Sequence, residues 1–172
     1  MTATPGGVPV PDPDPSEPRL TPRPQVILVV DDEADIRDSL RELFEGSLPD
    51  LRCLTADGGA TAIEILGREP VDLVVTDYKM PGMNGLELLS EARRLAPEVP
   101  RILITAFPDL DLAIRAVNDA RIENFFTKPF DPAKVVDTVR DILVDRRAAE
   151  QRSRAFARSL DTLRKRVTPP KN

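Results

Sequence analysis

Short apolar and β-branched runs alternate with helical patterns along the middle of the chain. The runs lie at 25–30, 51–55, 71–76, 101–105 and 124–127. Runs of this length and composition are typical of strands that are buried on both faces of a sheet. We therefore predict five strands at these positions.

The segments between the runs carry apolar residues at helical spacing, so that one face of each helix is apolar. The clearest sets are Ile36, Leu40, Leu43 and Phe44, then Ala113, Ala116, Val117 and Ala120. Two more helices are predicted at 59–67, with Ile63 and Leu66, and at 85–96, with Leu88, Leu89, Ala92 and Leu95. A fifth helix is predicted to begin at Asp131-Pro132, because a capping residue there precedes proline.

Strict alternation of strands and helices predicts an α/β fold with a doubly wound, five-stranded parallel sheet covered on both faces. In such sheets functional groups gather at the carboxyl ends of the strands, beside the point where the strand order reverses. The residues at the five strand ends are therefore the first candidates for a functional site.

The two ends of the chain differ from this middle part. Residues 1–24 contain eight prolines and are predicted to form an extended or disordered arm, although a loose PxxP pattern at 15–18 leaves a peptide-ligand role open. Residues 25–145 carry 24 acids and 13 bases, whereas residues 146–172 carry nine bases and two acids. We divide the chain into the arm 1–24, a domain at 25–145, a basic helical extension at 146–167 and a disordered tail at 168–172.

Composition excludes several classes of function. Histidine is absent, which excludes histidine acid–base catalysis, Ser-His and Cys-His nucleophiles and histidine metal ligands. The single Cys53 cannot form an intramolecular disulfide and is predicted to be a buried strand thiol. No apolar stretch is long enough to span a membrane and the N-terminus has no signal-peptide core, so we expect a cytoplasmic protein without a membrane partner.

The predicted strand ends carry a set of charged and polar residues. These are Asp31 and Asp32, Asp77, Thr105 and Lys128. Each has an ordinary structural interpretation alone, such as a helix cap or a solvated base. The fold would gather all of them around one crevice, where two like charges about 4 Å apart repel by roughly 4 kcal/mol at an effective dielectric constant near 20. A divalent cation held by oxygen atoms accounts for such a cluster, and Mg²⁺ is the expected ion.

In order and spacing, residues 25–145 resemble the receiver domains of two-component response regulators, the CheY-like superfamily. The matching elements are Asp31-Asp32, Asp77 followed by Met80-Pro81-Gly82-Met83-Asn84-Gly85, Thr105-Ala106 and Lys128-Pro129. The resemblance implies a flavodoxin-like fold with the βα unit repeated five times. It also implies that Asp77 accepts a phosphoryl group from the phosphohistidine of a histidine kinase or phosphotransfer protein. The product would be an aspartyl phosphate.

The resemblance further implies roles for the residues around Asp77. Mg²⁺ would be held by Asp32, Asp77 and the main-chain carbonyl of Lys79, with Asp31 acting partly through water. Lys128 and Thr105 would each hold a phosphoryl oxygen, and the Lys128-Pro129 bond is expected to be cis. Phe125 is either the switch aromatic or an ordinary core phenylalanine. Lys79 and Phe107 stand where relatives tune hydrolysis of the phosphate.

Other functions fit the sequence less well. A phosphate-binding NTPase needs a glycine-rich loop ending in Lys-Ser or Lys-Thr, which this chain does not contain. A dehalogenase-type phosphatase needs a second aspartate where Lys79 stands. The remaining alternative is a receiver-like interaction module that acts without phosphorylation. We expect a signalling protein with a downstream protein target, which catalyses at most its own phosphotransfer and slow dephosphorylation.

The last helix has no predicted stop. No Gly or Pro occurs from Ala133 to Val167, so it can run for about 50 Å at 1.5 Å per residue. Coiled-coil spacing is shown by Val135, Val139, Ile142, Arg146, Ala149, Ser153, Phe156, Leu160, Leu163 and Val167. The first three are needed for the domain core, so a seam would use the later ones. We favour a homodimer through this helix over a frayed helix, a helix docked on a partner, or a nucleic-acid contact by the arginines.

Overall fold

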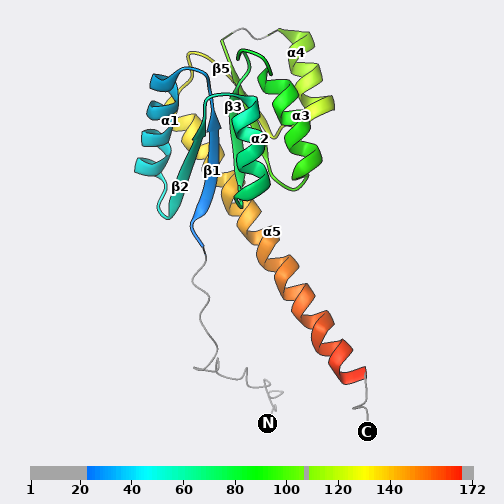
Figure 1. Ribbon diagram of the computed structural model, residues 1–172. Helices are drawn as coiled ribbons and strands as arrows, with labels where there is room; N and C mark the ends of the chain where they lie inside the picture. Colours follow the sequence, from blue (N-terminus) through cyan, green and yellow to red (C-terminus); the bar gives the residue numbers. More distant parts are fainter. Residues whose placement is uncertain (1–22, 107–108, 168–172) are drawn as a thin grey trace, which may run out of the picture.

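The computed structural model describes residues 23–106 and 109–167, in which strands alternate with helices (Figure 1). The strands are β1 (Gln25–Val30), β2 (Leu51–Ala56), β3 (Leu73–Asp77), β4 (Arg101–Thr105) and β5 (Asn124–Thr127). The helices are α1 (Ala34–Ser47), α2 (Gly59–Arg68), α3 (Gly85–Leu95), α4 (Leu110–Arg115) and α5 (Pro132–Val167). Phe107, most of the predicted arm and the predicted tail 168–172 lie outside the described residues.

All five strands are parallel and follow the order β2-β1-β3-β4-β5. The doubly wound fold is therefore confirmed, and the strand order reverses between β1 and β3. The register aligns Val30 with Thr76 and Asp77 with Ile104, so the ends of the three central strands lie side by side. This alignment places the residues that follow β1 next to the end of β3.

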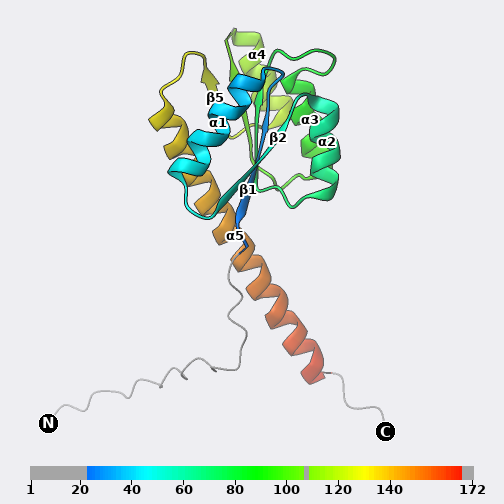
Figure 2. The same cartoon turned by 60° about the vertical axis from the view of Figure 1, so that its left-hand side comes forward.

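Two apolar clusters hold the helices on the two faces of the sheet (Figures 1 and 2). On one face, Phe44 of α1 and Val139 of α5 are buried against strand residues such as Ile27. On the other face, Leu88 of α3 and Ala62 of α2 are buried in the second cluster. Because each strand alternates its side chains between the faces, nearly all strand positions are apolar.

The fourth helix differs from its prediction. The α-helix ends at Arg115 and continues as a π-helical turn, Ala116–Ala120. The wider turn keeps Ala116 and Ala120 buried but leaves Val117, which was predicted on the buried face, 58 % exposed. Leu95 in the last turn of α3 is also exposed rather than buried, because it lies at the helix end beyond the sheet-facing residues.

Helix α5 is continuous from Pro132 to Val167 and projects well beyond the rest of the fold (Figure 1). Its start is capped as predicted, since the backbone N–H of Ala133 donates to Asp131 Oδ1 at 3.0 Å. Val135, Val139 and Leu143 are buried against the sheet, whereas Phe156, Leu160 and Leu163 are exposed. No helix within the described residues is both long and apolar enough to cross a membrane.

Candidate functional site

The carboxylates of Asp31 and Asp77 lie at neighbouring strand ends. Asp31 directly follows β1 and is 2 % exposed, and Asp77 is the last residue of β3 and is 9 % exposed. Both side chains are oriented by the chain that follows them. The N–H of Glu33 donates to Asp31 Oδ1 at 2.9 Å, and the N–H of Lys79 donates to Asp77 Oδ2 at 2.6 Å. The two acids are thus fixed in place rather than freely solvated.

Lys128 bridges these two carboxylates from the end of β5. Its Nζ lies 2.7 Å from Asp77 Oδ1 and 3.2 Å from Asp31 Oδ2. Partial burial alone would lower the pKa of Lys128, but the hydrogen bond to Asp77 and the charges of both acids outweigh it, so the pKa is raised. The ammonium therefore stays charged and neutralises much of the repulsion between the acids.

The ends of β4 and β5 complete this edge of the sheet. Thr105 is 1 % exposed, and its carbonyl accepts a hydrogen bond of 2.7 Å from the N–H of Lys128. The Lys128-Pro129 peptide bond is cis, as predicted. Phe125, two positions before the end of β5, is partly buried and packs against the cluster that contains Leu103. A core role for Phe125 is thus visible, and its role as a switch stays a prediction.

The loop after Asp77 folds tightly back on the strand end. Asn84 caps α3, since its side chain accepts from the N–H groups of Leu86 and Glu87 while Glu87 accepts from the N–H of Asn84. The N–H of Gly85 donates to the carbonyl of Tyr78 at 2.8 Å. A Cβ at Gly85 would collide with the carbonyl of Asp77. Sequence reasoning included Gly85 only as part of the motif that follows Asp77, and the close approach to the carbonyl of Asp77 was not predicted.

The oxygen atoms at this edge fit a hard cation in kind but are not arranged as a finished metal site. Asp31 and Asp77 are close enough to share one ammonium group, whereas Asp32 is exposed. In residues 23–106 and 109–167 no three His, Cys, Asp or Glu side chains are grouped so that they could hold a metal ion. The structure thus gathers Asp31, Asp77 and Lys128, and leaves Asp32 beside them in solvent.

Cys53 lies apart from this edge, within β2, and is buried as predicted. Burial raises the pKa of its thiol to about 12, and the charge of Glu45 adds to the effect. A thiol with so high a pKa is protonated at neutral pH and is a poor nucleophile. Cys53 is therefore a packing residue.

Comparison with known proteins agrees with this geometry. The family model of the response regulator receiver domain matches residues 27–140. The hydrogenase transcriptional regulatory protein HoxA of Cupriavidus necator is 36 % identical over 121 residues, which cover 70 % of this chain and 24 % of HoxA. The response regulator protein PilR of Pseudomonas aeruginosa is 38 % identical over 115 residues, which cover 67 % of this chain and 25 % of PilR.

A solved structure shows the same fold. The signal receiver domain of an HD domain-containing protein from Pseudomonas fluorescens superimposes with a TM-score of 0.69 at 31 % identity, covering 73 % of this chain and 99 % of that domain. The chain spans about a quarter of the length of the curated relatives that it matches. The family match, the parallel sheet and the acids bridged by Lys128 lead to one conclusion: this chain belongs to the response regulator receiver domain family.

Proposed function

We propose that Asp77 accepts a phosphoryl group from a phosphohistidine of a histidine kinase or phosphotransfer protein. The observation that carries this proposal is the 2.7 Å contact between Asp77 Oδ1 and Lys128 Nζ at the carboxyl edge of the sheet. In the reaction a carboxylate oxygen forms a bond to phosphorus while the bond between phosphorus and the histidine nitrogen breaks. The electron pair of that bond leaves with the imidazole.

Three groups of the protein support this transfer. The N–H of Lys79 fixes the plane of the Asp77 carboxylate through its bond to Oδ2. Lys128 offers a point charge to a phosphoryl oxygen, and the hydroxyl of Thr105 offers a hydrogen bond to another. The N–H of Lys128 donates to the carbonyl of Thr105, and this bond holds the Lys128 backbone against β4 at the same edge of the sheet as Asp77.

Mg²⁺ would neutralise charge on the transferring phosphoryl oxygens. Asp32, Asp77 and the carbonyl of Lys79 would hold it directly, and Asp31 partly through water. Asp32 would have to turn inward for this, because its side chain is exposed in the structure. The cation would also offset the negative charge of the buried pair Asp31 and Asp77 if Lys128 bound the phosphoryl group instead.

Labelling with acetyl phosphate and Mg²⁺, followed on phosphate-sensitive gels, tests the proposal. The wild-type protein should shift in mobility, Asp77→Asn should not, and a chelator should prevent the shift. Asp57→Asn is the matched control, because Asp57 is an exposed acid directly after β2 and its replacement should leave labelling unchanged. Undiminished labelling of Asp77→Asn would show that another residue is the acceptor.

We infer that phosphorylation acts on the surface formed by residues 109–144 and thereby on a downstream protein. Drawing Thr105 towards a phosphoryl group would leave space that Phe125 can fill, since both lie on adjacent strands. The adjoining π-helical turn, Ala116–Ala120, is an irregular segment of the kind often found at functional sites. Amide shifts confined to the loop after Asp77 on adding a phosphate mimic would contradict this inference.

We further propose that the protein forms a homodimer through α5. Phe156, Leu160 and Leu163 are 67 %, 51 % and 55 % exposed and share one face of the helix. Their four- and three-residue spacing suits a coiled coil with a second copy of the same helix. Light scattering should show a dimer for the whole chain, and a monomer for Leu160→Glu and for residues 1–145.

Arg158→Glu is the control, because it also introduces a glutamate, with a larger change in net charge, on the other side of the helix and should still dimerise. If the whole chain and residues 1–145 are both monomers at tens of micromolar, with and without phosphorylation, the homodimer is excluded.

A further inference from the structure

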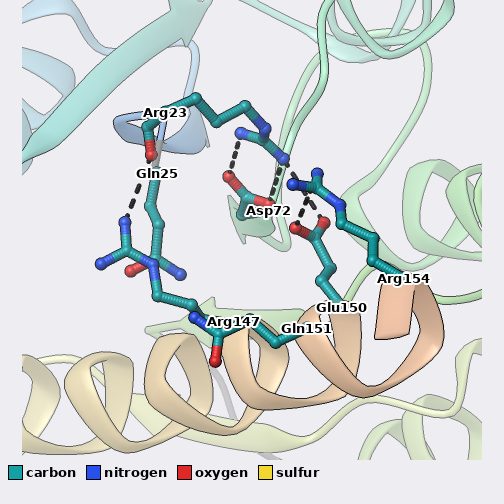
Figure 3. Close-up of a pocket in the computed structure, with 7 residues that line it drawn as sticks. All are labelled: Arg23, Gln25, Asp72, Arg147, Glu150, Gln151 and Arg154. Carbon is teal, nitrogen blue, oxygen red and sulfur yellow. Dashed lines mark hydrogen bonds and ion pairs between the residues drawn. The ribbon is translucent and has the colours of Figure 1, made fainter. Parts of the chain in front are cut away.

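Arg23, before β1, and Gln25, the first residue of β1, both contact α5; Figure 3 shows Arg23 beside Arg147 and Glu150. The side-chain amide of Gln25 donates to the carbonyl of Leu143 at 2.8 Å. Arg147 donates to the carbonyl of Arg23 at 3.2 Å, and Nη2 of Arg23 lies 3.5 Å from Glu150 Oε1. Positions 143, 147 and 150 lie on one helix face because they are four and three residues apart.

Arg23 is also bound to the start of β3. Its Nη1 and Nη2 lie 2.7 Å from Oδ2 and 2.7 Å from Oδ1 of Asp72, which is a two-pronged ion pair. Asp72 is 2 % exposed and accepts a further bond of 2.8 Å from the N–H of Val26. A buried carboxylate of this kind requires a positive partner, and Arg23 supplies it.

The guanidinium of Arg23 thus connects Asp72, which directly precedes β3, with Glu150 of α5. Asp72 precedes the strand that ends in Asp77, and Glu150 lies two turns beyond the last buried residue of α5, Leu143. Glu150 also forms ion pairs with Arg146 at 3.6 Å and with Arg154 at 3.5 Å, each one helical turn away. Arg23 therefore links Glu150 of α5 to Asp72 at the start of β3, in addition to the bond between Gln25 and Leu143.

These contacts leave the apolar face of α5 uncovered. Phe156 lies nine residues after Arg147, which is about two and a half turns at 3.6 residues per turn, so the two side chains point to opposite sides. Arg23 therefore contacts α5 on the side of the helix away from Phe156.

We propose that Arg23 is a positioning residue for the α5 extension: by bridging Asp72 and Glu150 it orients residues 146–167 relative to the sheet. We call Arg23, Asp72 and Glu150 the clasp. The clasp is a property of a single chain, and only its use in presenting a dimer seam rests on the homodimer proposed above.

The distance between two spin labels measures this orientation directly. Labels at Arg94→Cys on α3 and Ala157→Cys on the extension, in a Cys53→Ala background, would be placed in the full chain and diluted with unlabelled protein. Both label positions are exposed. The distance distribution should be narrow with an intact clasp and clearly broader in Arg23→Gln, because the helix then pivots after its last buried turn.

Hydrogen exchange supplies the second readout. Amides of residues 146–154 should exchange about tenfold faster in Arg23→Gln. Glu150→Gln should have a similar effect, and the double variant should exchange no faster than either single one, because both remove the same bridge. The protection of β1 and β3 should be kept in Glu150→Gln, because that variant leaves the ion pair between Arg23 and the buried Asp72 intact. Arg23→Lys, which keeps the charge but loses the two-pronged geometry, should fall between wild type and Arg23→Gln.

Arg68→Gln is the matched control, since it removes a 77 % exposed arginine from an ion pair on α2 and should change neither measurement. An unchanged distance distribution in Arg23→Gln overturns the proposal, as does equal broadening in Arg68→Gln. Failure of the homodimer would appear separately, as a monomeric whole chain in light scattering with the clasp variants still showing their effects.

Discussion

A phenylalanine side chain has opposite environments in the sheet domain and in the extension of α5. Phe44 of α1 is 0 % exposed and packed in the core, whereas Phe156 of α5 is 67 % exposed. The difference lies in the surroundings and not in the helices, because both are regular and amphipathic. The sheet supplies α1 with an apolar surface to cover, whereas residues 151–161 of α5 are all exposed. The sheet domain is stabilised by its own apolar core, whereas the extension exposes Phe156, Leu160 and Leu163.

Replacing one phenylalanine by alanine in each region should show the largest difference between them. Phe44→Ala should lower the free energy of unfolding by about 3–5 kcal/mol, because it leaves a cavity in a fully packed core. Phe156→Ala should change the unfolding of the sheet domain by less than about 0.5 kcal/mol. Urea unfolding followed by circular dichroism measures both values. A large loss of domain stability in Phe156→Ala would mean that its side chain packs on the domain in solution.

A second pair of variants tests the tight edge around Asp77. Gly85→Ala should cost about 3 kcal/mol, because the new methyl group would collide with the carbonyl of Asp77. Gly67→Ala, within α2 and facing open space, should instead stabilise by about 0.5–1 kcal/mol. Thermal unfolding of the two variants compares them directly. Equal effects at both positions would show that the loop can relax away from the strand end.

The smallest expected effect concerns Lys128 in alkaline solution. Its pKa is raised in the folded protein, so its contribution is present below the unfolded pKa and is lost as the pH rises through the folded pKa. Lys128→Met should therefore flatten the decline of stability with pH in that range. The measurement requires a Cys53→Ala background, because the Cys53 thiol, with a pKa of about 12, titrates there as well. An identical decline in both proteins would contradict the bridge seen here.

Prediction from sequence succeeded where a local pattern of residues is enough to determine the secondary structure. The apolar runs at 25–30 and 101–105 match β1 and β4, and the lack of Gly and Pro after Ala133 correctly predicted a continuous α5. Alternation of strands and helices predicted the parallel doubly wound sheet, and the observed strand order brings Asp31 and Asp77 together.

Prediction failed where the decisive contacts join distant parts of the chain. The π-helical turn after Arg115 has no periodic signal, so Val117 was placed on the wrong face. Arg23 fell within the predicted disordered arm, yet it is bound to Asp72, 49 positions later.

Helix α5 runs back along parallel strands, so it emerges beside Gln25 at the amino edge of the sheet while Asp77 lies at the carboxyl edge. A kinase bound over Asp77 and a second copy bound to Phe156 would therefore not compete for space. An already assembled dimer would remain a substrate, and each of its two acceptors could be modified in turn. Singly modified dimers would then form a distinct population, so the response to a rising phosphodonor concentration would pass through an intermediate level.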